Sequence, residues 1–146
     1  MTFSIDCSRI TRRNTTALGI VLLLLMLVLQ GCSKELQYSQ RREVAQTFMN
    51  HLVAHEVDKA AAMTPQTKEH QLAVQLLADA IALKIRNENI QRFEYVFISE
   101  TTVNANQAKV VFSQVVNDSA VQDNVVVELL YSQEKSTWLV NNVILG

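Results

Sequence analysis

Two histidines on the predicted first helix have a spacing that could suit a metal ion. His51 and His55 are four residues apart, which places both imidazoles on one side of a helix. A zinc site needs a third and usually a fourth ligand, yet Glu56 points about 100° away from His55 and His70 lies beyond a proline. We therefore expect no metal site. We place His55 in the buried stripe near the helix end, where it packs or caps.

Cys32 follows an apolar segment and could carry a covalent lipid. The apolar segment, Ala17–Leu29, comes after a start that is rich in arginine. It is shorter than the about 20 residues of a membrane-spanning helix and has the length of a signal-peptide core. The tetrapeptide that follows, Leu-Gln-Gly-Cys, resembles a bacterial lipobox, with an aliphatic residue, a small residue before the cysteine and Ser33 after it.

The lipobox predicts how the chain is processed. Cleavage between Gly31 and Cys32 would remove residues 1–31 as a signal peptide and leave residues 32–40 as a lipidated N-terminus and tether. A diacyl or triacyl anchor that includes palmitate would hold firmly, since each buried methylene adds about 0.8 kcal/mol. Ser33 stands where an aspartate would signal inner-membrane retention, so we expect the periplasmic face of the outer membrane.

Composition excludes several functions. The formal net charge is −1, and no basic stripe is present, so nucleic acid is not an expected partner. After cleavage only Gly146 remains of the three glycines, which excludes phosphate-binding loops and a nucleophile elbow. The one remaining cysteine, Cys32, would be acylated, so no disulfide and no cysteine nucleophile are expected. No cofactor is expected either.

The first half of the mature chain has helical periodicity. Val44, Phe48 and Leu52 recur every four residues, which predicts a first helix with one apolar stripe. The segment KAAAM predicts a short second helix. Asp58 would cap this helix by accepting its free N–H groups, and Pro65 would end it.

A third helix is predicted over Thr67–Arg86. Apolar residues cover more than half of its circumference at about 100° per residue, and Gln75, Asp79 and Arg86 form a narrow polar strip. We expect such a helix to be wedged between the first helix and the sheet. Its apolar residues are Leu72, Leu76, Leu77, Ala80, Ile81, Leu83 and Ile85.

The second half of the mature chain has strand patterns. Phe93, Tyr95 and Phe97 alternate with polar residues, which predicts one face directed at the core. The joints between strands contain Asn, Asp or Ser and predict hairpins, because Asn and Asp tolerate left-handed backbone. Later strands have apolar residues on both faces, so we expect a homodimer through the sheet. The predicted strands are Arg92–Glu100, Gln107–Val116, Asn124–Ser132 and Thr137–Leu145.

Helices followed by strands predict an α+β fold with helices on one face of an antiparallel sheet. The segments EVDKAAAM, AKVVF, VVVELLY and WLVNNV, in this order, resemble the nuclear transport factor two-like (cystatin-like) superfamily over about Arg41–Leu145. The resemblance implies a domain over residues 41–146, with N-terminal helices packed on a curved four-stranded antiparallel meander. This cone can hold a ligand at its mouth. Members include isomerases, hydrolases, scaffolds and secretion-machine subunits, so the fold alone does not give the function.

The cone implies where a ligand would lie. Relatives of the ketosteroid isomerase kind use a carboxylate base with a Tyr or acid donor, and the nearest equivalents here are the two strand tyrosines with His55 or Asp58. We expect no carboxylate to project inward, because Asp79 faces the polar strip and Glu94 and Glu128 are out of phase with the apolar faces. We therefore predict no catalytic residues. We expect the two strand tyrosines and Trp138 to be core residues first and pocket walls second. The residues that could line a ligand pocket are His55, Phe93, Tyr95, Phe97, Tyr131 and Trp138.

Three functions fit these observations. The leading hypothesis is a lipid-anchored periplasmic protein without catalysis, which presents its cone or a sheet face to a protein partner or a small apolar ligand. The second is an enzyme or small-molecule binder with a polar cone. The third is an accessory subunit of an envelope or secretion assembly.

Replacing the acyl acceptor tests the lipobox. We expect Cys32→Ser to leave unprocessed precursor in the inner membrane, because a serine cannot accept the lipid through a thioether. Membrane fractionation and the mass of the chain measure this. A Cys32→Ser variant that is still cleaved and fractionates with the outer membrane would contradict the lipobox.

Overall fold

Helices precede strands along the chain, which confirms the predicted α+β class. The computed structural model describes residues 40–146, except the side chain of Gln122. Cys32 and the predicted signal peptide lie outside these residues. The elements are a helix over residues 40–53, α2 (Val57–Ala62), α3 (Lys68–Asn87), β1 (Phe93–Asn104), β2 (Gln107–Val116), β3 (Ser119–Ser132) and β4 (Thr137–Leu145).

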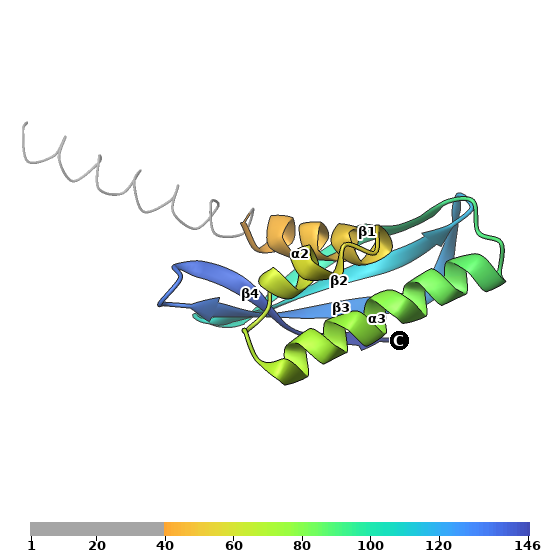
Figure 1. Cartoon of the computed structure of the whole chain (residues 1–146). Coiled ribbons are helices and arrows are strands. Elements are labelled where there is room, and N and C mark those ends of the chain that lie inside the picture. The colour runs from red at the N-terminus through yellow and green to blue at the C-terminus, as the bar shows by residue number, and fades with distance from the viewer. Residues whose placement is uncertain (1–39) are drawn as a thin grey trace, which may run out of the picture. The chain divides into compact units, whose positions relative to one another are not determined.

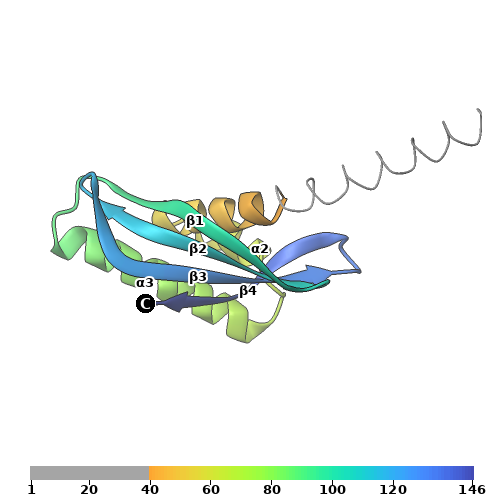
Figure 2. The same cartoon turned by 180° about the vertical axis from the view of Figure 1, so that it is seen from behind.

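The four strands form one antiparallel meander in the order β1-β2-β3-β4. All the described helices lie in front of the sheet in Figure 1, and the sheet lies in front of them when the molecule is seen from behind in Figure 2. The helices therefore cover one face of the sheet. No helix within residues 40–146 is both long enough and apolar enough to cross a membrane.

Bulges bend the sheet. In β1 the pairing with β2 skips Ile98 and Val103, and in β4 the pairing with β3 skips Asn141. An extra residue in one strand bends it and increases its twist. It also reverses the phase of the side chains that follow, so Glu100 lies opposite the inward-facing Val110.

The core lies between the concave face of the sheet and the helix over residues 40–53. Phe48 and Leu52 are fully buried, as the predicted stripe required, and Tyr95 is buried with Phe93 and Phe97 packed beside it. The predicted core face of β1 is therefore confirmed. The sheet contributes Ala108, Val110, Phe112, Val125, Val127, Leu129, Trp138 and Val140.

Three strand boundaries differ from the prediction, one of them by a single residue, because β1 begins at Phe93 and not at Arg92. β2 and β4 have their predicted bounds, but β3 begins at Ser119 and not at Asn124. Asn117 and Asp118 both have positive φ, 48° and 65°, and so make a two-residue hairpin turn that lets pairing start at once. β1 likewise continues past its predicted end to Asn104.

The starts of α2 and α3 compare differently with the prediction. α3 begins within one residue of its prediction, and its N-cap residue Thr67 accepts a hydrogen bond from the His70 N–H at 3.3 Å. The prediction that Asp58 caps α2 was wrong, because the N-cap position is Glu56 and Asp58 lies in the first turn. The Glu56 carboxylate instead accepts hydrogen bonds from Lys59 at 2.7 Å and pairs with His51 at 2.6 Å.

The third helix is not wedged between two layers, contrary to the prediction. Only one side of α3 is buried, with Val74, Ala78 and Ile81. Its leucine strip, defined as Leu72, Leu76 and Leu83, is exposed by 61%, 60% and 52%. The outer sheet face also exposes apolar residues, among them Val96 and Ile144, and the predicted homodimer through this face stays a prediction.

The contrast between core and surface leucines tests the packing. We expect Leu52→Ala, at a position with 0% exposure, to lower the free energy of unfolding by about 2–5 kcal/mol, because it leaves a cavity. Leu72→Ala is the matched control and should change it by no more than about 0.5 kcal/mol. Urea unfolding measures both. Equal losses from the two variants would show that α3 is covered in solution.

Candidate functional site between α3 and β4

An apolar groove of about 380 Å³ lies between α3 and β4. Two exposed alanines and partly buried aliphatic side chains form its walls, and Phe48 reaches it from the core. Within residues 40–146, the lining includes no Asp, Glu, Lys, Arg or Ser. Its residues are Phe48, Thr64, His70, Ala73, Val74, Leu76, Leu77, Ala80, Val140, Asn141, Asn142, Val143 and Leu145.

The turn between α2 and α3 sets the position of the groove. The Met63 carbonyl accepts a hydrogen bond from the Val140 N–H at 2.9 Å, so the chain is fixed to β4 just before α3 begins. From there α3 and β4 run in the same direction, from left to right in Figure 1. Pro65 separates the two helices, because the residue before a proline avoids helical conformation.

The polar members of the lining are mostly engaged within the protein. Thr64 is buried and its hydroxyl donates to the Ala61 carbonyl at 2.8 Å. Asn142 donates to Glu128 at 3.2 Å and accepts from the Val143 N–H at 2.9 Å. These contacts hold the walls in place and leave few polar groups to meet a ligand.

The six residues predicted to line a pocket fall into separate contacts, and none of them lines this groove. Phe93 and Tyr95 meet edge to face at 5.3 Å, and Tyr131 meets Trp138 at the same distance. Phe97 packs on Phe112 in the core and under the Arg42 guanidinium.

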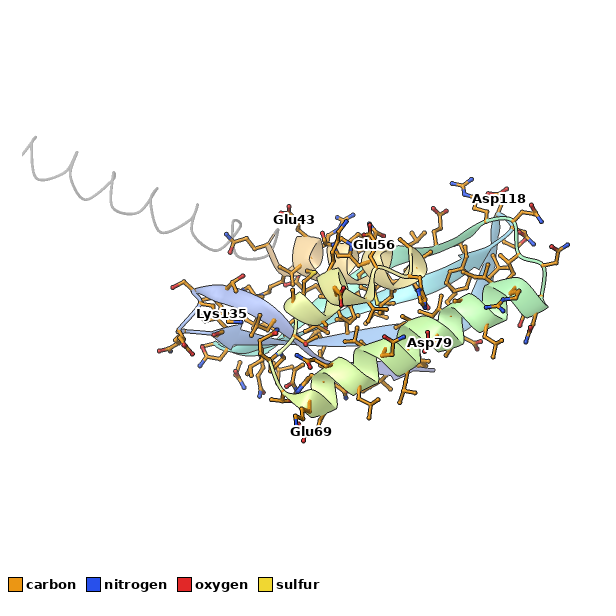
Figure 3. The ribbon with its side chains drawn as sticks, viewed as in Figure 1. Glu43, Glu56, Glu69, Asp79, Asp118 and Lys135 are labelled. Atoms are coloured by element: carbon orange, nitrogen blue, oxygen red, sulfur yellow. The ribbon has the colours of Figure 1, made fainter. Side chains whose placement is uncertain are left out.

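His55 does not belong to the buried stripe, contrary to the prediction. The helix ends at residue 53, and His55 has a φ of 56°, the left-handed conformation that commonly terminates helices. Its side chain is 48% exposed and its Nε2 lies 2.9 Å from Asp79 Oδ1 on α3. The hydrogen bond from Gln75 and, to a smaller extent, the hydrogen bond from His55 lower the pKa of Asp79. Figure 3 shows Asp79 on α3 and Glu69 near the start of that helix.

Glu100 is an inward carboxylate that the sequence reasoning missed. It is almost buried and lies 3.3 Å from the Arg41 guanidinium, which also donates to Thr102 at 2.8 Å and stacks on Trp138. Burial raises the pKa of Glu100, and the hydrogen bond from Arg41 opposes that rise. The cluster fastens the start of the first described helix to β1 and β4. The bulge at Ile98, which gives no signal in the alternation, is the reason that Glu100 points inward.

Within residues 40–146, no group of three or more His, Cys, Asp or Glu side chains lies close enough together to hold a metal ion. His51 pairs with Glu56, the N-cap residue of α2, and His55 pairs with Asp79 on α3. Covalent catalysis requires a base beside a nucleophile. Beside the groove, the His70 Nδ1 lies 2.8 Å from the Thr67 hydroxyl, but that oxygen also caps α3 by accepting from the His70 N–H, and Thr67 does not line the groove.

Comparison with known proteins gives a fold and no family. No family model matches the sequence, and no curated protein matches it. A similar solved structure is the "Putative NTF2-like transpeptidase" from Campylobacter jejuni, with a TM-score of 0.55 and 14% identity over 70% of this chain and 98% of that chain. Another is the protein named Rd1NTF2_05, which carries five substitutions, with a TM-score of 0.55 and 11% identity over 75% of this chain and 99% of that chain.

The domain therefore has the nuclear transport factor two-like fold, as the order of its segments predicted. At these identities the likeness extends to the fold alone. The helices and the curved antiparallel sheet form the cone of that class.

The buried phenol of Tyr95 gives a test of the core in solution. Burial raises the pKa of Tyr95 from 10.0 to about 12, so the hydroxyl stays protonated and cannot serve as a base near neutral pH. Since the folded-state pKa is raised, the stability linked to the protonated form is complete below pH 10 and is lost as the pH rises towards 12. Tyrosinate absorbance with parallel circular dichroism should show a late ionisation of Tyr95, at about pH 12 or together with unfolding.

Matched variants assign that ionisation. Tyr95→Phe should remove the late step and Tyr131→Phe should leave it in place. A folded Tyr131→Phe chain that shows no late step would contradict the burial of Tyr95.

Proposed function

We propose that this chain is a lipid-anchored binding protein of the bacterial cell envelope that acts without catalysis, and that the α3–β4 groove holds an apolar ligand. The lining of the groove carries the proposal, because its described residues combine aliphatic walls with no ionisable group other than His70. Its volume of about 380 Å³ falls in the range of small-molecule pockets, about 300–1,000 Å³. The lipobox at Cys32 supports the anchor and the location at the outer membrane.

The transpeptidase named among the similar structures is not carried over to this chain. Transpeptidation by covalent catalysis needs a nucleophile with a base beside it. Among the described lining residues Thr64 has the only hydroxyl, and it is buried and donates to a backbone carbonyl. Binding therefore fits the groove better than turnover does.

A neutral apolar dye, phenylnaphthylamine, tests the groove. The fold accounts for 98% and 99% of the two similar solved chains, so residues 33–146 are suited to expression without the anchor. We expect one dye to bind with enhanced fluorescence and to be recovered unchanged. Ala80→Phe should weaken binding at least about tenfold, because the ring fills the groove from an exposed position.

Ala54→Phe is the matched control, because Ala54 is also exposed but does not line the groove. It should bind the dye like the unmodified chain. Undiminished binding by Ala80→Phe, or an equal loss in both variants, would place the dye elsewhere and contradict the proposal.

A further inference from the structure

The groove is polar at one end and apolar at the other. The bond between Met63 and Val140 places the start of α3 beside the middle of β4, so His70 and Asn141 lie at the same end. From there α3 and β4 run in the same direction (Figure 1). The last lining residues along the two elements, Ala80 and Leu145, are therefore at the opposite end. The lining thus changes from hydrogen-bonding to aliphatic along its length.

Two groups at the polar end are available to a ligand. The His70 Nδ1 contacts the Thr67 hydroxyl at 2.8 Å, and its Nε2 has no hydrogen-bond partner among residues 40–146. The carboxamide of Asn141 is exposed and likewise has no hydrogen-bond partner in the described part of the chain. Asn141 is the bulged residue of β4, a position at which a bulge redirects a side chain.

The dimensions of the groove fit a chain-like molecule. From His70 to Ala80, α3 rises roughly 15 Å at about 1.5 Å per residue, and the volume of about 380 Å³ is small for that length. An added β-strand is a poor occupant, because the Val140 and Val143 N–H groups already donate to Met63 and Asn142. A narrow hydrocarbon chain matches the length and the walls together.

We infer that the groove takes a single-chain amphiphile, with a hydrogen-bonding head at His70 and Asn141 and a hydrocarbon tail along Leu77, Ala80 and Val143. This inference rests on the proposed function and adds the class and orientation of the ligand. A free fatty acid and a lysophospholipid share this chemistry.

Displacement of phenylnaphthylamine from residues 33–146 tests the orientation. Dodecanoate and dodecanol carry a head on the same tail, and dodecane carries none. We expect both headed ligands to displace the dye at concentrations at least about tenfold lower than dodecane does. His70→Phe combined with Asn141→Leu should remove that difference, because the head loses its hydrogen-bond partners, and it keeps the cap of α3, which uses the His70 backbone N–H.

The outcomes separate the two claims. Equal displacement by all three ligands, or a difference that persists in the double variant, would overturn the amphiphile and leave the apolar groove standing. Absence of dye binding would overturn the proposed function as well.

Dodecanoyl lysophosphatidylcholine as a fourth competitor identifies the source of the ligand. If it acts at lower concentration than dodecanoate, the ligand is a membrane-derived phospholipid, and the reverse order indicates a free fatty acid.

Discussion

The bend of the β-sheet is the constraint on which the rest of this domain depends. Bulges at Ile98 and Val103 curve β1 and, with the bulge at Asn141 in β4, turn one face of the sheet into a concave surface. The helix over residues 40–53 fits this surface with Phe48 and Leu52, which are among the most deeply buried side chains of the core. The same bulge at Ile98 turns Glu100 inward, where the Arg41 guanidinium meets its charge.

The groove follows from the way in which α3 completes the cone. Only one side of α3 packs on the core, and the turn before it is tied to β4 through Met63 and Val140. The neighbouring side of α3 and the last residues of β4 therefore face each other as two aliphatic walls. Apolar surface that is neither buried in the core nor scattered singly commonly marks a binding site. This is the physical basis for proposing a binding protein, and among the described residues the lining contains no carboxylate that could act with His70 as an acid–base pair.

Periodicity predicted most of the fold and little of the site. Local hydrophobic patterns reflect which face of each element is buried. They predicted the apolar stripe that contains Phe48, the bounds of β2 and β4, and the order of the elements. His55 was misplaced because a left-handed residue ends the helix before it, and Glu100 was missed because a bulge changes the alternation. The sequence gives no sign that His70 lies in the groove. Its approach to β4 depends on the backbone hydrogen bond between Val140 and Met63, and local sequence patterns do not reveal a bond between distant segments.

Methyl NMR spectra of residues 33–146 titrated with dodecanoate test most directly whether the ligand binds in the α3–β4 groove. The groove predicts that the largest shifts belong to Leu77, Val140 and Val143, whose side chains line it. The outward-facing methyls of Val96 and Ile144 serve as internal reference points on the other side of the sheet. Shifts concentrated at Val96 and Ile144, with the groove methyls unmoved, would contradict the account and place binding on the outer face of the sheet.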